Sequence, residues 1–296
     1  MRIEIIGAGA VGLLLGSYFA EQHADVTFIK RSNEQEPHYL NITRTNVDGS
    51  SVQLQVESAT TINEEAAILF IAVKYGQLQE VYQKLKHVNP SIPIVFLQNG
   101  LAHYEEALQL NQRHIAFCSI QFGAQKIAEN HVAHKGNGVM KLAVAKGDSS
   151  HFDFLKDFSS VQLPIEFESD AETMLVEKAL LNCFINPLTA ILQVKNGQLI
   201  EQNNAFQILK NLYNEIITTF PQYAKTFQFE QVIALCKRTA ENTSSMLADR
   251  LANRKTEIDT IAGAIIKKAG QNDKQMPVLQ TLYMLVKAFE ESGEKM

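Results

Sequence analysis

The feature that most constrains the fold is a glycine motif near the start of the chain, Gly7-Ala8-Gly9-Ala10-Val11-Gly12. Residues 3–6 before it have the composition of a buried strand, and residues 10–22 have that of a helix. In this setting the first glycine allows a tight turn, the second lets a pyrophosphate approach the backbone, and the third lets the helix pack on the strand. The motif therefore predicts a Rossmann-like unit that binds a dinucleotide; the alternative is a turn with incidental glycines.

The end of the second predicted strand, residues 25–29, indicates which dinucleotide binds. NAD sites place a carboxylate there for the ribose hydroxyls, whereas NADP sites place cations that hold the 2′-phosphate. Here Lys30, Arg31 and Ser32 follow the strand, and no carboxylate occurs before Glu34. Because a guanidinium holds a phosphate with paired hydrogen bonds, Arg31 predicts NADP (NADPH). The alternative is a solvated Lys-Arg pair, and FAD fits less well because its sites also favour an acidic residue.

The pattern of the chain changes near residue 168. Before it, strand-like runs alternate with helical patterns, which predicts β–α–β units and a largely parallel sheet. After it, apolar residues recur at helical spacing. We predict an α/β fold, with a Rossmann-like, doubly wound NADP-binding domain in residues 1–168 and an all-α substrate and catalytic domain in residues 169–296. The predicted strands are residues 3–6, 25–29, 67–73, 92–97, 115–117, 138–144 and 165–167, and the predicted helices are residues 10–22, 171–194, 203–220, 229–242, 255–270 and 278–292.

Composition and charge limit the class of protein. The 296 residues are enough for two cores, and the net charge of −5 argues against nucleic acid as a partner. The longest clean apolar run, residues 66–73, is far shorter than the ~20 residues of a membrane helix, and the N-terminus lacks a signal-peptide pattern. Three separated cysteines, with no CxxC or Cys/His cluster, indicate reduced thiols and no metal site. These features predict a soluble cytoplasmic protein.

Two polar residues directly follow predicted strands. Lys74 comes after residues 67–73, and Asn99 follows residues 92–97. Open α/β sheets bind their ligands at the carboxyl ends of the strands. On position alone each residue is either a ligand contact or an ordinary polar loop residue, and both readings stay open.

A polar stripe lies inside the first helix of the second domain. Lys178, Asn182 and Asn186 are spaced by four residues, so they share one face of a nearly apolar helix. Buried polar groups need partners, and a substrate carboxylate or hydroxyl would serve. A lysine partly removed from water has a lowered pKa, which suits a proton donor near neutral pH. The alternative is that Lys178 extends to the surface while the asparagines bond to the backbone.

Several motifs together resemble the ketopantoate reductase (2-dehydropantoate 2-reductase) family, nearly end to end. The glycine loop is shared by many families, whereas the helix that carries Lys178 and the last two motifs are specific. The matching segments are Gly7 to Gly12, Val73-Lys74, Gln98-Asn99-Gly100, Lys178 through Asn182-Cys183-Phe184-Ile185-Asn186-Pro187-Leu188-Thr189-Ala190, Lys195-Asn196-Gly197, Glu241-Asn242-Thr243-Ser244-Ser245-Met246-Leu247 and Thr256-Glu257-Ile258-Asp259.

The resemblance implies NADPH-dependent reduction of 2-dehydropantoate to (R)-pantoate, on the route to pantothenate and coenzyme A. Lys178 would donate the proton to the keto oxygen, and Glu257 would lie near the nicotinamide and this lysine. Asn99 would contact cofactor and substrate, while Arg31 and Lys74 would belong to the phosphate side of the cofactor. The substrate-binding residues that the resemblance implies are Asn99, Lys178, Asn182, Asn186, Asn196 and Ser245, with Asn242 as a further neighbour.

One loop departs from the family pattern. It contains Cys118 to Ala124, and the cofactor contact that the family makes there falls at Ala124 or at its neighbours Gly123 and Gln125. Without the resemblance, Asn242, Ser244 and Ser245 would be interpreted as a helix N-cap cluster, and Glu257 as a solvated helix residue.

Two other functions stay open. A related reductase of another branched 2-keto acid would use the same fold and lysine with a different pocket, because fold does not decide substrate. A non-catalytic NADPH-binding sensor would need no proton donor. In each case the partner is a small molecule, neither nucleic acid nor a membrane, and the protein is a monomer or a homodimer.

Overall fold

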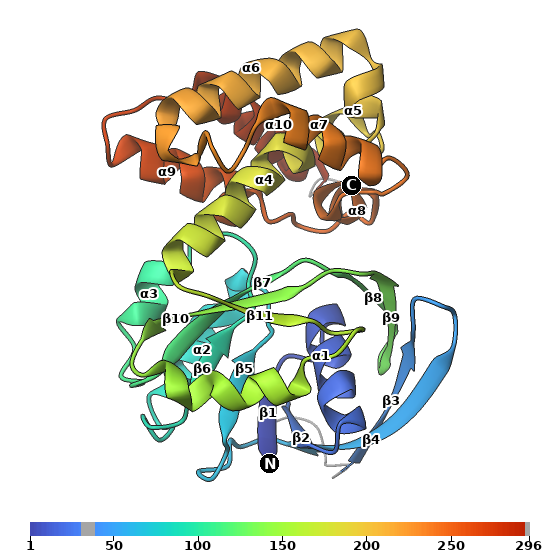
Figure 1. Cartoon of the computed structure of the whole chain (residues 1–296), viewed down its shortest axis with the longest axis vertical. Coiled ribbons are helices and arrows are strands. Elements are labelled where there is room, and N and C mark those ends of the chain that lie inside the picture. The colour runs from blue at the N-terminus through green and yellow to red at the C-terminus, as the bar shows by residue number, and fades with distance from the viewer. Residues whose placement is uncertain (31–38, 294–296) are drawn as a thin grey trace. The chain divides into compact units, whose positions relative to one another are not determined.

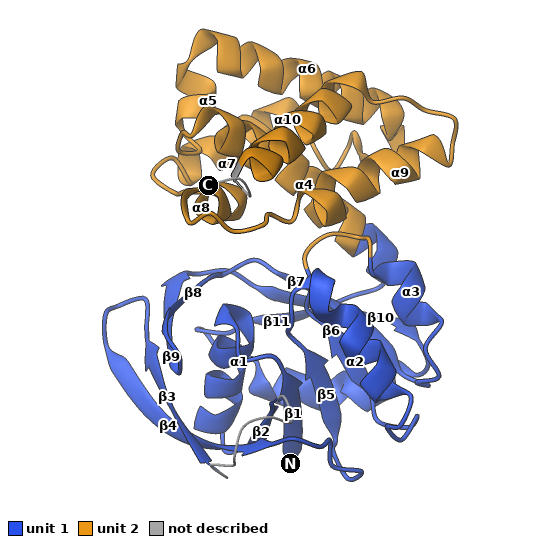
Figure 2. Cartoon of the chain, turned by 180° about the vertical axis from the view of Figure 1, so that it is seen from behind, with its two compact units in different colours: residues 1–98, 103–174 blue, residues 99–102, 175–296 orange. Residues whose placement is uncertain are grey.

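The computed structural model describes residues 1–30 and 39–293, so Arg31, the expected phosphate-binding residue, lies outside the described residues. The chain divides into two compact units, coloured separately in Figure 2. Unit 1 comprises residues 1–98 and 103–174, and unit 2 comprises residues 99–102 and 175–296. One division between the units lies between residues 174 and 175, so the first turn of helix α4 (Ala171–Leu192) groups with unit 1.

Unit 1 contains a parallel sheet of the Rossmann type. Its strands lie in the order β4-β2-β1-β5-β6-β7, which reverses between β1 and β5, and neighbours in this order are parallel. Strands buried on both faces are largely apolar, which is why β1, β2, β5, β6 and β7 could be predicted from the sequence. The α/β, Rossmann-like fold is confirmed. The bounds are β1 (Arg2–Ile6), β2 (Asp25–Ile29), β4 (Ser51–Ala59), β5 (Ile68–Ile71), β6 (Ile94–Phe96) and β7 (Ile115–Ile120).

Further strands extend the sheet at both sides. β10 (Met140–Lys146) pairs antiparallel with β7 and parallel with β11 (Ile165–Glu168). On the other side β3 (Tyr39–Thr45) pairs with β4, and the antiparallel hairpin of β8 (Gly123–Ala128) and β9 (His131–Gly136) follows. The short helical segments of unit 1 are η1 (Tyr75–Gln77), α2 (Leu78–Leu85), α3 (Tyr104–Leu108) and η2 (Ser149–Phe158).

Helix α1 (Ala10–Glu21) is enclosed by this extended sheet. All residues from Gly12 to Phe19 are buried. The helix contacts β1, β2 and β4 and also β3, β8 and β9, and both views show these strands around it (Figures 1 and 2). A helix that is covered on all sides needs no polar face, which accounts for the run Leu13-Leu14-Leu15.

A buried arginine lies beside α1. Arg44 on β3 is 2% exposed, and its guanidinium lies 3.8 Å from the ring centroid of Tyr18. It donates hydrogen bonds to Glu21 Oε2 at 2.6 Å and to Asn46 Oδ1 at 2.8 Å. Glu21 itself lies at the surface, with 41% of its side chain exposed. The surface carboxylate therefore compensates a buried charge.

We expect Glu21→Ala to lower the free energy of unfolding by about 2 kcal/mol, because it removes a hydrogen-bonded counter-charge from the buried Arg44. Urea denaturation of the two proteins would measure this difference. Glu64→Ala, at another exposed glutamate of unit 1, serves as the control and should leave the midpoint unchanged. Equal midpoints for the Glu21 variant and the wild type would contradict the expectation.

Unit 2 is helical and is built around α4. Val176, Leu180 and Phe184 of α4 are fully buried in its core. By length and composition alone α4 could cross a membrane. However, 67% of the apolar 18-residue stretch of α4 that meets this criterion is buried inside the protein, as in the core helix of a soluble protein. The other helices are α5 (Gln198–Glu201), α6 (Asn203–Thr219), η3 (Pro221–Tyr223), α7 (Phe229–Arg238), α8 (Ser245–Leu251), η4 (Asp259–Gly263), α9 (Ala264–Gly270) and α10 (Pro277–Gly293).

The predicted bounds of two helices in unit 2 were wrong at one end each. The helix expected at residues 229–242 stops at Arg238, and the chain turns there so that Asn196 N–H donates to Asn242 O. The helix expected at residues 255–270 begins only at Asp259, with the π-helical turn η4, because Thr256 N–H and Oγ1–H instead donate to Glu290 on α10.

Candidate functional site

The glycine-rich loop of unit 1 has no room for side chains at two of its glycines. Gly7 has a φ of +113°, and a Cβ on it would lie 2.8 Å from the carbonyl carbon of Ala72. A Cβ on Gly12 would lie 2.1 Å from Gly7 O. Because α1 starts at Ala10, the first N–H groups of the helix face the loop without intrahelical acceptors. This is the backbone arrangement that accommodates a pyrophosphate.

A cavity of about 390 Å³ lies beside this loop, wholly within unit 1. The loop lines one part of it, the end of β2 another, and Lys74 follows β5 at its wall. Glycine backbone and several ammonium groups around one cavity fit the phosphates of a dinucleotide. The charged residues that line it in the described part of the chain are Lys30, Lys74, Glu80, Lys84, Lys126 and Glu129.

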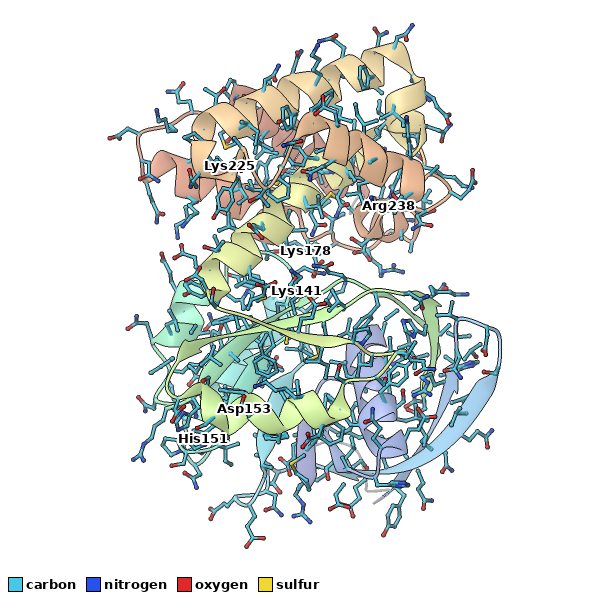
Figure 3. All side chains as sticks on the ribbon, viewed as in Figure 1. Lys141, His151, Asp153, Lys178, Lys225 and Arg238 are labelled. Carbon is cyan, nitrogen blue, oxygen red and sulfur yellow. The ribbon has the colours of Figure 1, made fainter. Side chains whose placement is uncertain are left out.

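Lys178 lies on α4, as Figure 3 shows. The side chain is half-buried, and burial lowers the pKa of its ammonium group below the usual range of a lysine. Among the described residues the ammonium has no hydrogen-bond or ion-pair partner in the protein. One turn further along α4, Asn182 is also half-buried. The helix therefore presents an ammonium group whose charge is poorly compensated, next to an amide.

The next turn of α4 is connected to α8. Asn186 is 7% exposed, and its Nδ2 donates to Ser245 Oγ at 3.4 Å. The hydroxyl groups of Thr189 and Ser244 lie 2.7 Å apart, and Ser244 caps α8 by accepting from Leu247 N–H. The N-cap that the sequence allowed is thus formed by Ser244, while Ser245 remains exposed at the first turn of α8.

Asn99 and Glu257 are in direct contact. Asn99 Nδ2 donates to Glu257 Oε2 at 2.9 Å, although the two residues are 158 positions apart. The next residue, Gly100, has a φ of +84°, and a Cβ on it would lie 2.1 Å from Thr260 O. Leu101 N–H donates to the same oxygen at 3.0 Å. The loop 99–102 is therefore fastened to the segment that contains Glu257 and η4, and a π-helical turn of this kind is often found near functional sites.

Asn196 lies in a tight connection before α5. It is 7% exposed, and its Nδ2 donates to Thr239 Oγ1 at 3.0 Å. Its Oδ1 is buried and has no hydrogen-bond partner among the residues that the structure describes. A buried acceptor without a partner is unfavourable, so this amide has unused capacity for a ligand or water.

The expected site residues fall into two groups. The residues expected to contact the substrate, together with Glu257, all belong to unit 2. The glycine loop and Lys74 belong to unit 1, where Gly7, Ala8, Gly9 and Lys74 line the cavity. Ala124 lies on β8, half-buried, and is not among the residues that line it. The direct contacts that the structure adds within the substrate group are Asn99 with Glu257 and Asn186 with Ser245.

Sequence reasoning did not identify two charged residues of the β8–β9 hairpin that line the cavity. Lys126 and Glu129 line the cavity from this hairpin. Their positions carry no recognisable motif, because the pairing of β9 with β3 and the contacts of β8 and β9 with α1 bring them to the cavity. The missing signal was a pairing between strands far apart in the sequence.

Two family models match most of the chain. The model described as ketopantoate reductase PanE/ApbA matches residues 3–147, and the model of the C-terminal part of the same enzyme matches residues 170–290. A 2-dehydropantoate 2-reductase of Bacillus subtilis is 33% identical over 298 residues, which cover 100% of this chain and 99% of that protein.

Solved structures agree with this match. The crystal structure of a probable 2-dehydropantoate 2-reductase from Bacillus subtilis has a TM-score of 0.85 at 31% identity and covers 97% of this chain and 99% of its own. A ternary complex of D-mandelate dehydrogenase with NADH and anilino(oxo)acetate shares the fold, with a TM-score of 0.85 at 23% identity and coverage of 99% and 100%. With its two matching models and a relative at 33% identity over its full length, the chain belongs to the ketopantoate reductase family.

Proposed function

We propose that this protein reduces 2-dehydropantoate to (R)-pantoate with NADPH, with Lys178 as the proton donor, on the route to pantothenate and coenzyme A. The observation that carries the proposal is Lys178 itself, a half-buried ammonium group with a lowered pKa on the helix that the family model covers. Such a group suits an acid that works near neutral pH.

The cofactor, when bound, supplies a hydride to the keto carbon of the substrate. The negative charge that develops on the keto oxygen is neutralised by a proton from Lys178 Nζ. Because Lys178 has no counter-ion among the described residues, its ammonium is also suited to attract the anionic substrate before the reaction. After the reaction Lys178 is a neutral amine, and it regains its proton from solvent.

The substrate is held by amide and hydroxyl groups of unit 2. Asn182, Asn186, Asn196 and Ser245 bind its carboxylate and hydroxyl groups, together with Asn99. An amide offers both donors and an acceptor, so a row of asparagines can satisfy a ligand that carries a carboxylate and hydroxyls. The buried, unpartnered Oδ1 of Asn196 supports a role in accepting a hydroxyl proton.

NADPH is held mainly by residues of unit 1. The backbone of Gly7 to Gly12 receives the pyrophosphate, Arg31 and Lys74 bind the phosphate side, and Ala124 adds a contact from β8. Asn99 and Glu257 lie at the nicotinamide end. In this assignment residues 1–168 form the NADP-binding domain, and residues 169–296 form the substrate domain. The enzyme is cytoplasmic and is a monomer or homodimer. Its partner is a small molecule, not nucleic acid or a membrane.

An absorbance assay of purified protein tests the proposal. NADPH oxidation should require ketopantoate, and NADH should support a much lower rate. Ketoisovalerate serves as a second substrate, because a related reductase would prefer it or a similar acid. No NADPH oxidation with either acid would refute the reductase function, whereas a higher kcat/KM for ketoisovalerate would refute only the assignment of substrate.

We expect Glu257→Ala to lower kcat/KM for ketopantoate by about 10–100-fold, which is the value of one hydrogen bond to a charged group. The reason is that Glu257 Oε2 holds the Nδ2 group of Asn99 at 2.9 Å. Steady-state kinetics would measure the effect, with Glu291→Ala, at an exposed position of α10, as the control. Unchanged kinetics for Glu257→Ala would contradict the assignment of both residues.

A further inference from the structure

We propose that Lys126, on strand β8, binds the 2′-phosphate of the cofactor and contributes to the choice of NADP over NAD. The inference rests on the proposed use of NADPH and extends it to a residue that no sequence motif marks. β8 is not part of the parallel Rossmann core. It belongs to the extension of the sheet beyond β4, in the order β3-β9-β8, and Lys126 lines the nucleotide cavity from there.

The β8–β9 turn and the end of β2 line the same cavity, the turn with Glu129 and Asn130 and the strand end with Ile29 and Lys30. β2 runs parallel to β4, with Ile29 opposite Ala59, and β3 starts antiparallel at the same edge, with Tyr39 opposite Glu57. β9 begins opposite Thr43 of β3, and Thr43 N–H donates to Asn130 O in the turn. The carboxyl end of β2 is where NADP-binding folds hold the 2′-phosphate. The turn is thus next to the same cavity as the end of β2.

The side chain of Lys126 reaches the glycine-rich loop. Its Nζ donates to Ala8 O at 2.9 Å. Lys126 also lines the same cavity as Ile29 and Lys30 at the end of β2. An ammonium group has three donors, so the bond to Ala8 orients Lys126 and leaves capacity for a phosphate oxygen. The loop carbonyl thus fixes the position of the cation.

The charge balance of the cavity favours a strongly anionic ligand. Among the described residues four lysines and two glutamates line it. Lys84 and Glu80 are four positions apart on α2, so they lie on one face of that helix and partly compensate each other. Lys126 is exposed, and its one hydrogen bond among the described residues is to a neutral carbonyl oxygen. A phosphate dianion would supply the missing counter-charge.

The test is the binding of NADP⁺ and NAD⁺ to Lys126→Gln, measured by titration calorimetry without substrate. We expect the Kd for NADP⁺ to rise about tenfold or more, because a charge-assisted hydrogen bond is lost, and the Kd for NAD⁺ to stay within twofold. Lys135→Gln is the matched control, since Lys135 is exposed on the neighbouring strand β9 and does not line the cavity. It should bind both cofactors like the wild type.

The outcomes separate this inference from the proposed function. A wild type that binds NADP⁺ no better than NAD⁺ would refute the choice of NADPH, and the inference with it. A wild type that prefers NADP⁺, combined with an unchanged preference in Lys126→Gln, would refute the role of Lys126 alone. An equal loss for both cofactors would also overturn it, because it would place Lys126 at the pyrophosphate that the two cofactors share.

Discussion

Replacing Lys178 by methionine is expected to lower kcat for ketopantoate reduction by about 10²–10⁴-fold, the usual contribution of a positioned proton donor. Methionine keeps the length and the apolar contacts of the side chain but removes the ammonium group. Steady-state assays with saturating NADPH would measure the effect. Lys210→Met, at an exposed position of α6, is the control and should retain full activity.

The same variant separates a catalytic role from a structural one. Burial lowers the pKa of Lys178 in the folded protein, so the folded state binds this proton less tightly than the unfolded state. That difference costs stability at every pH below the folded pKa, and the cost fades as the pH rises toward the unfolded value. Lys178→Met removes the cost, so its Tm at neutral pH should equal or exceed that of the wild type. A large fall in Tm together with the loss of activity would indicate that Lys178 supports the fold instead.

The lowered pKa also sets the direction of the pH profile. Ketone reduction needs the protonated lysine, so kcat should fall as the pH rises through the pKa of Lys178. Because that pKa is below the usual range of a lysine, the fall should begin at a lower pH than a solvated lysine would give.

Gly12→Ala is expected to lower the free energy of unfolding by about 4 kcal/mol or more, which places it among the exceptional single substitutions. The added Cβ would lie 2.1 Å from Gly7 O and 3.0 Å from the Cβ of Ala72, so two backbone segments must separate. That separation moves the loop that receives the pyrophosphate, and NADP⁺ binding should be lost even where some protein remains folded. Soluble yield, urea denaturation and calorimetry with NADP⁺ would measure these effects.

Gly136→Ala is the matched control for this experiment. Gly136 lies on β9 in the same unit, and a Cβ on it would have no heavy atom within 4 Å. It should fold and bind NADP⁺ as the wild type does. If Gly12→Ala also folded and bound NADP⁺ like the wild type, the result would contradict the expectation that the cofactor site depends on the close packing of α1 on the loop.

Most of the parallel strands and the long helices could be predicted from the sequence, whereas β3, β4 and the β8–β9 hairpin could not. β5, with the sequence Ile-Leu-Phe-Ile, is buried along its whole length, so its apolar run was a direct signal. β8, with the sequence Gly-Ala-Gln-Lys-Ile-Ala, is largely exposed and resembles a loop. Its structure depends on pairing with β9 and on contact with α1, and neither is visible in a local window. β3 and β4 were missed because their outward residues are polar.

The candidate site was partly predictable for a similar reason. The stripe of Lys178, Asn182 and Asn186 follows from helical spacing alone. The contact of Asn99 with Glu257 joins residues 158 positions apart, and nothing in either local sequence indicates it. Lys126 was missed altogether, since a lysine on an exposed strand is ordinary until the fold brings it to the glycine loop.

The enclosure of α1 also bears on how the protein is made. Synthesis proceeds from the N-terminus, and domains form as their segments leave the ribosome. The helix that begins at Ala10 is covered on its outer side by β8 and β9, which end only at Gly136. Until then the face of α1 that contacts β8 and β9 in the folded protein stays exposed to water. A fragment that stops near residue 110 retains the nucleotide-binding motif but lacks this cover, so it is a natural client for chaperones rather than an independent nucleotide-binding module.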